Sequence, residues 1–97
     1  MGTSRTFTCR ACGYRAEVSG GDDAGTLVLT TTVTCTICRR LYDVPVATTE
    51  RLPPTWTRVE PACPKDERHP VERWSHPGPC PRCGQRMRRG PVEVFWD

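Results

Sequence analysis

Apolar residues in this chain come in short runs that polar residues, glycines and prolines interrupt. The longest uninterrupted apolar runs have three residues, as in residues 27–29. Residues 26–34 are rich in β-branched side chains, and alternation over residues 92–96 places every second side chain on one face, as in a strand. No segment repeats its apolar residues with the helical period. The predicted strands span residues 14–18, 26–34, 41–46 and 92–96.

Composition indicates that a hydrophobic core alone does not hold this chain together. The chain has 97 residues, of which 36% are apolar, below the roughly 45–50% of ordinary globular domains. Ten prolines and eight glycines make it rich in loops. Such a small chain buries too little apolar surface to offset the entropy lost on ordering, so we expect disulfide or metal cross-links.

The hydropathy pattern also bears on where the protein works. A transmembrane helix needs about 20 apolar residues, and no apolar run approaches that length. The first six residues, Met-Gly-Thr-Ser-Arg-Thr, lack the apolar segment of a signal peptide. We therefore expect no membrane association and a cytoplasmic location.

Seven cysteines carry the clearest chemical signal. Three Cys-x-x-Cys pairs stand at positions 9/12, 35/38 and 80/83, and Cys63 stands alone. Disulfide frameworks need an oxidising compartment and usually an even number of cysteines. Two residues between cysteines let both thiolates face one point from a tight turn, here called a knuckle. Two knuckles supply the tetrahedron of a Zn²⁺ site, so the spacing favours metal binding over disulfides.

The first predicted site joins the first two pairs. Twenty-two residues separate these pairs, slightly more than the roughly 15–20 that are usual for such sites. Gly13 follows the first knuckle, where the backbone commonly needs a positive φ, whereas Arg39 takes that place in the second. The expected ligands of this zinc ion are Cys9, Cys12, Cys35 and Cys38.

The second predicted site contains Cys63, Cys80 and Cys83 and needs one more ligand. Three thiolates and one imidazole are a common closed zinc set. His69 follows Cys63 by six residues and is the favoured fourth ligand, ahead of His76. A carboxylate such as that of Asp66 suits a thiolate-rich site less well. Two zinc ions per chain are therefore expected.

These sites imply two modules in sequence. We expect an N-terminal zinc ribbon with four cysteine ligands over residues 1–47, a proline-containing linker over 48–59 and a ribbon-like module with three cysteines and one histidine over 60–97. The expected fold class is small, metal-stabilised and mainly β, with short antiparallel strands. A second pairing stays open, in which Cys9/Cys12 share a metal with Cys80/Cys83, and Cys35/Cys38 share one with Cys63 and a histidine. The sequential pairing is favoured because adjacent elements usually pack together.

Two knuckles resemble those of a known group of folds. The segments Cys9-Arg-Ala-Cys12-Gly13-Tyr14 and Cys80-Pro-Arg-Cys83-Gly84 are similar to the first and second knuckles of rubredoxins and, more broadly, of zinc ribbons. Rubredoxins hold one iron in four thiolates and carry single electrons. Zinc ribbons occur in transcription factors, ribosomal proteins and RNA-polymerase subunits. The resemblance implies a zinc-finger-like metal fold and leaves the function open.

The distribution of charge indicates nucleic acid as a candidate partner. The formal net charge is +3, with 14 basic and 11 acidic residues. Residues 80–91 contain four arginines and no acid, and arginine suits bidentate contact to phosphate. Anionic metal centres would offset part of this charge. The arginines proposed for contact with nucleic acid are Arg82, Arg86, Arg88 and Arg89.

Together these features favour a binding protein over an enzyme. Metal sites closed by four protein ligands leave no position for a reactive water, and no nucleophile–base pair or phosphate loop is evident. We expect structural zinc ions and an adaptor role with another protein as partner, with Trp56 docking the two modules together. Nucleic-acid or transcription-machinery binding is the alternative, and rubredoxin-like iron redox or metal handling is less favoured. No small-molecule substrate is indicated.

Overall fold

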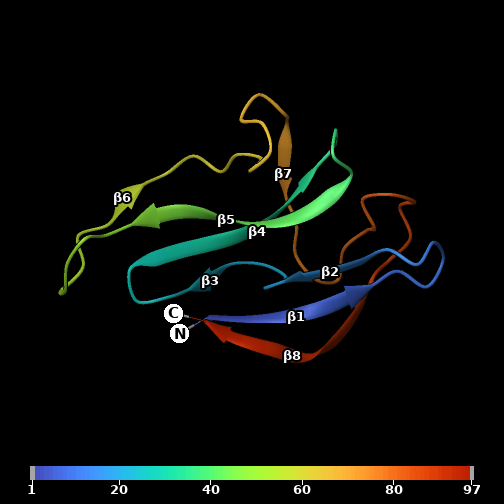
Figure 1. The fold of residues 1–97 in the computed structure, drawn as a ribbon, viewed down its shortest axis with the longest axis horizontal. Coiled ribbons are helices and arrows are strands. Elements are labelled where there is room, and N and C mark those ends of the chain that lie inside the picture. The colour runs from blue at the N-terminus through green and yellow to red at the C-terminus, as the bar shows by residue number, and fades with distance from the viewer. Residues whose placement is uncertain (1, 97) are drawn as a thin grey trace.

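The computed structural model describes residues 2–96 as a set of short antiparallel strands, and those residues contain no helix. The strands are β1 (Gly2–Thr8), β2 (Arg15–Val18), β3 (Asp23–Ala24), β4 (Val28–Cys35), β5 (Arg40–Thr48), β6 (Thr57–Arg58), β7 (Val71–Arg73) and β8 (Arg88–Trp96) (Figure 1). This confirms the expected small, mainly β fold. Among the residues described, no helix has the length and apolarity to cross a membrane.

The first and last strands of the chain lie side by side. One sheet has the order β2-β1-β8, so β1 is its central strand. Gly2 pairs with Trp96 at one end, and Thr8 pairs with Arg88 at the other (Figure 1). The end of β1 and the start of β8 therefore lie together, with one Cys-x-x-Cys knuckle directly after β1 and another shortly before β8.

The second sheet is built on the β4–β5 hairpin. Its order is β3-β4-β5-β6, and β7 pairs with the end of β4. The hairpin turns through the middle knuckle, where Cys35 pairs with Arg40. Cys35 also pairs with Val71 of β7, on the other side of β4. The chain segment just before β7 is thereby held beside the middle knuckle.

A small aromatic core lies close to the first and last knuckles. Phe7 is fully buried and meets Trp74 edge to face, with ring centroids 5.3 Å apart. The indole N–H of Trp74 donates to the carbonyl of Pro79 at 2.8 Å. Met87 is buried in the same cluster. Burial of these side chains contributes apolar packing to the stability of the fold.

Hydrogen bonds join the two sheets. The Asp43 carboxylate of β5 accepts from the Ser19 backbone N–H at 2.8 Å and from the Thr32 hydroxyl at 2.6 Å. Partial burial of this carboxylate raises the pKa of Asp43, although these donors oppose the shift. The Thr32 hydroxyl oxygen also accepts from the N–H of Gly20 at 3.0 Å. Each sheet also contains strands from both expected modules, because β8 joins β1 in one sheet and β7 joins β4 in the other.

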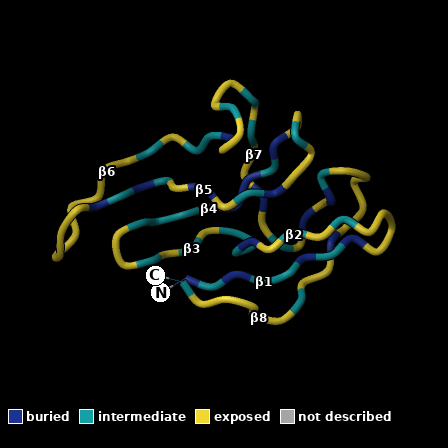
Figure 2. Tube along the Cα trace, viewed as in Figure 1, coloured by how far each residue is buried: buried dark blue, intermediate teal, exposed yellow. Residues whose placement is uncertain are grey.

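The expected linker doubles back on the sheet it leaves. Residues 50–58 are exposed throughout (Figure 2), and β6 returns to pair with the end of β5 through Ala47 and Arg58. Trp56 lies in this exposed segment and is 39% exposed. The expectation that Trp56 docks two modules together is therefore wrong, because the segment pairs with its own hairpin at the margin of the molecule.

Candidate metal centres

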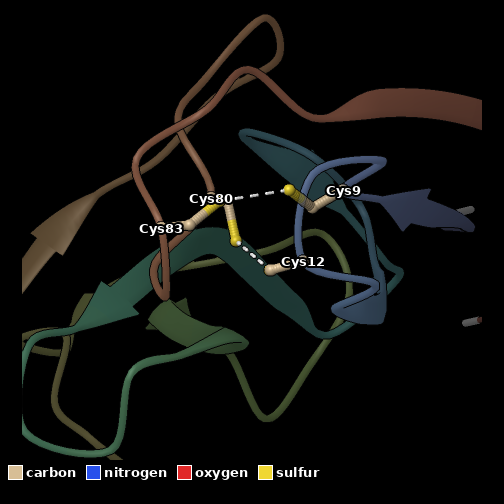
Figure 3. Close-up of side chains that lie close together, drawn as sticks. All are labelled: Cys9, Cys12, Cys80 and Cys83. Atoms are coloured by element: carbon tan, nitrogen blue, oxygen red, sulfur yellow. Dashed lines mark hydrogen bonds between the residues drawn. The ribbon is translucent and has the colours of Figure 1, made fainter.

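The first group of candidate ligands joins the two ends of the chain. Cys9 and Cys12 come from the knuckle after β1, and Cys80 and Cys83 come from the knuckle before β8. Their side chains point toward one another (Figure 3). The Sγ atoms of Cys9 and Cys83 are 3.3 Å apart, and those of Cys12 and Cys80 are 3.6 Å apart. Cys9 and Cys80 are buried, whereas Cys12 and Cys83 face solvent.

The second group gathers around the β4–β5 turn. Cys35 and Cys38 belong to the middle knuckle, and Cys63 and His69 come from the loop before β7. The Sγ atoms of Cys38 and Cys63 are 3.7 Å apart. The Nδ1 atom of His69 lies 3.6 Å from the Sγ of Cys35 and 3.5 Å from that of Cys38.

Both groups have the dimensions of a tetrahedral metal site. Metal–sulfur bonds of about 2.3 Å in a tetrahedron place the sulfurs roughly 3.8 Å apart, and a sulfur and an imidazole nitrogen roughly 3.6 Å apart. The observed contacts of 3.3–3.7 Å are close to these values. Disulfide sulfurs would be about 2.05 Å apart, and all seven cysteines are free. Each group therefore fits one metal ion.

The knuckles share one backbone design. In the first, the N–H of Gly13 donates to the carbonyl of Cys9 at 2.9 Å, and Gly84 makes the same bond to Cys80 at 2.9 Å. Both glycines have φ of 82°, a conformation that a Cβ disfavours. Arg39 takes the equivalent place in the middle knuckle with φ of 58° and donates to Cys35 at 2.8 Å. The turn geometry thus overrides the side-chain preference at Arg39.

Backbone N–H groups favour the thiolate form in each group. The backbone N–H of Cys12 is the main cause that lowers the pKa of Cys9 to about 7. Burial opposes ionisation of Cys63, but several hydrogen bonds, led by those from the N–H groups of Asp66 and Lys65, outweigh it and lower the pKa of Cys63 to about 6. Since thiolates are the metal-binding form of cysteine, each group already contains one thiol that ionises near neutral pH.

A carboxylate lies near the other ring nitrogen of the histidine. Because Nδ1 of His69 faces the sulfurs, its Nε2 is directed outward, where it lies 3.9 Å from the Asp66 carboxylate. Arg68 donates to the same carboxylate at 3.0 Å, and this guanidinium lowers the pKa of Asp66. A carboxylate beside the free nitrogen of a metal-binding histidine favours the tautomer that presents the other nitrogen to the metal. Asp66 therefore lies beside His69 and outside the ligand group.

The sequential pairing of the cysteines is corrected by this arrangement. Cys9 and Cys12 lie with Cys80 and Cys83, not with Cys35 and Cys38, and His69 lies with the middle knuckle. The cause is strand pairing, because β8 pairs with β1 and β7 pairs with β4. One sequence signal matches the observed grouping. The first and last knuckles share the form Cys-x-x-Cys-Gly, whereas the middle knuckle has Arg39 in the final place.

The other histidine, His76, is half-buried and lies beside the aromatic core. The ring of His76 lies 5.6 Å from that of Phe7, and its side chain lies in neither ligand group.

Comparison of the chain with protein-family models finds no match, and comparisons with curated proteins and with solved structures find none either.

The four predicted arginines lie at the knuckle end of the molecule with four others. Arg88 and Arg89 start β8, opposite Thr8 and Phe7 of β1. The four that sequence reasoning missed are Arg10, Arg15, Arg39 and Arg40, which come from the other two knuckles and the strands they lead into. Segments 9–17, 35–41 and 80–89 contain these eight arginines and one acid, Glu17. Among residues 2–96, none of the eight forms an ion pair.

Proposed function

We propose that this protein is a zinc-binding module in which two structural metal ions hold an arginine-rich surface that binds nucleic acid. The donor sets support zinc, since four cysteines, or three cysteines with one histidine, are common structural zinc sets. When bound, each ion would cross-link chain segments that a weak hydrophobic core alone does not hold. Cys9, Cys12, Cys80 and Cys83 would hold one ion, and Cys35, Cys38, Cys63 and His69 the other.

Each candidate group offers four ligand atoms, which is the number that a structural zinc site requires. Four protein atoms complete a tetrahedron, so neither ion would have an open position for water or substrate. We therefore propose a binding protein rather than an enzyme. The thiolates also set the local charge, because zinc with four thiolates carries a formal charge of −2 and zinc with three thiolates and one imidazole carries −1.

The observation that carries the nucleic-acid proposal is the gathering of eight arginines at the knuckle end. With Glu17 counted, these three segments (9–17, 35–41 and 80–89) have a surplus of seven positive charges, which exceeds the three negative charges of the two zinc centres. The arginines therefore do more than neutralise the metals. A surface with unpaired arginines attracts the phosphate backbone by releasing its counterions.

A protein partner is the second candidate, and one observation favours it. Strand β8 is an edge strand of its sheet, and it exposes Phe95 (68%) and Val94 (42%). Exposed edge strands accept further strands from other chains. This surface lies at the opposite end of β8 from the arginines, so the two candidates predict different contact residues.

Binding of fluorescent single-stranded and double-stranded oligonucleotides, measured by anisotropy over a salt series starting at 50 mM, tests the proposal. We expect R86S/R88S to bind more weakly and to lower the slope of log affinity against log salt by about 2. The control is R51S/R58S, which removes the same charge from the exposed segment at the other end. Equal weakening by both variants, or no binding by the zinc-loaded wild type at 50 mM salt, would refute the nucleic-acid proposal.

A further inference from the structure

We infer that a hollow between the first knuckle and β5 binds a phosphate group of the nucleic-acid strand. The hollow has a volume of about 430 Å³, and its lining includes Arg15, Arg40 and Arg82 together with Tyr14 and Tyr42. This inference rests on the proposed function, because it assigns one contact of that nucleic-acid surface to a defined place.

The three arginines converge from separate parts of the chain. Arg15 starts β2, Arg40 starts β5, and Arg82 lies within the last knuckle. The lining contains one carboxylate, that of Glu17, so positive charge is in excess. Guanidinium groups bind phosphate oxygens through paired, charge-assisted hydrogen bonds. Arginines drawn from three segments around one hollow are the arrangement that a phosphate would recognise.

Arg82 is held in place before any ligand binds. Its guanidinium carbon lies 4.8 Å from the centre of the Tyr14 ring. Its Nε donates to the carbonyl of Arg39 at 3.4 Å, and the Arg39 guanidinium donates to the carbonyl of Arg82 in return. Because an arginine has five N–H donors, others remain for a ligand. Ordering a long side chain in advance lowers the entropy lost on binding.

Tyr14 is itself fixed by the opposite wall of the hollow. Its hydroxyl accepts from the backbone N–H of Leu41 at 2.9 Å. This bond joins the residue before β2 to the start of β5, so Tyr14 and Leu41 hold together the segments that contain Arg15 and Arg40. The hollow is therefore framed by backbone and ring contacts, and not by flexible side chains alone.

The hollow also depends on both metal groups. Arg82 lies between Cys80 and Cys83, and Arg15 follows Cys12, so these two arginines are placed by the first group. Arg40 follows Cys38 of the second group. The volume exceeds what a phosphate alone fills, since one water occupies about 30 Å³ of liquid. The hollow has room for a phosphate together with part of its attached sugar.

Two double variants of the zinc-loaded protein test the inference with an eight-residue oligothymidylate as the probe. R15A/R40A removes two arginines of the hollow and leaves the knuckle interiors intact. R88A/R89A removes the same charge from β8, outside the hollow. We expect R15A/R40A to weaken binding about tenfold, as loss of charged hydrogen bonds implies, and R88A/R89A to weaken it less. Zinc content of two ions per chain must be retained in both.

Amide NMR titration with the same oligonucleotide locates the contact, and titration with inorganic phosphate gives the second arm. Shifts centred on Tyr14, Arg40 and Arg82 support the inference. If R15A/R40A binds like wild type while R88A/R89A is weakened, the hollow is the wrong place but the nucleic-acid function stands. If no oligonucleotide binds but phosphate shifts these amides, the site takes free phosphate and the proposed function fails. Absence of both responses overturns both.

Discussion

The Sγ atoms of Cys9 and Cys83 lie 3.3 Å apart although 74 residues separate them in the chain. The contact follows from the antiparallel pairing of β1 with β8, which brings Thr8 opposite Arg88. A metal ion at this point would connect the first strand to the last. The second group, in contrast, spans residues 35–69, so its loss would release a shorter part of the chain.

Removing one ligand from each group should therefore have different consequences. In C80S we expect loss of one metal ion and of amide protection in β1 and β8, because a structural zinc site contributes on the order of 10 kcal/mol to folding. In C63S we expect loss of the other ion and of protection in β7, with β1 and β8 still protected. Native mass spectrometry and hydrogen exchange measure both quantities. Identical loss of protection in the two variants would contradict the assignment.

The backbone conformation of the knuckles gives a second prediction. Nothing lies within 4 Å of a Cβ added at Gly13, so G13A should act through its positive φ alone and lower the free energy of unfolding by about 1 kcal/mol. Arg39 provides the reverse experiment. R39G and R39A both remove the guanidinium and its methylene chain, but only R39A keeps a Cβ at φ of 58°.

Denaturant titration of zinc-loaded R39G and R39A should place the glycine variant about 1 kcal/mol higher in unfolding free energy. Equal stability of this pair would mean that the left-handed backbone at the middle knuckle carries no cost.

The tryptophans provide a matched test of the core. Trp74 is 4% exposed and packs on Phe7, whereas Trp56 is 39% exposed. We expect W74A to lower the free energy of unfolding by about 3–5 kcal/mol and W56A to change it by less than about 0.5 kcal/mol. Thermal unfolding by circular dichroism compares them. A large effect of W56A would contradict the exposed, peripheral position of Trp56.

Metal identity is tested by elemental analysis and by absorption spectra of protein purified under reducing conditions. We expect two zinc ions per chain and a colourless protein, because zinc has no electronic transitions in the visible range. A red protein with iron in the group of four cysteines would favour the rubredoxin-like alternative. Fewer than two metal ions per chain would count against one of the ligand groups.

The sequence predicts the local features of this fold better than the distant ones. The Cys-x-x-Cys spacing indicates each knuckle because the turn is made by five adjacent residues, and β-branched residues indicate β4. Which knuckles share a metal depends on pairing between strands some 80 residues apart in the chain, and spacing contains no information about that. The preference for adjacent elements therefore led to the wrong pairing.

The arginine surface was likewise only partly predictable from the sequence. The sequence singles out Arg82, Arg86, Arg88 and Arg89 because they are neighbours in the chain. Arg15 and Arg40 look unremarkable in sequence, since they join the others only when the β2–β1–β8 sheet and the β4–β5 hairpin meet at Tyr14 and Leu41. Clusters of residues drawn from separate segments are found once the topology is known.

One metal ion is proposed to join the first and last knuckles of the chain, and the other to join the middle knuckle to Cys63 and His69. Substitution of both ions by ¹¹³Cd and heteronuclear correlation of each cadmium with cysteine β-protons measures this directly. We predict that one cadmium couples to Cys9, Cys12, Cys80 and Cys83, and the other to Cys35, Cys38 and Cys63. Coupling of one cadmium to Cys9 and Cys12 together with Cys35 and Cys38 would contradict the account.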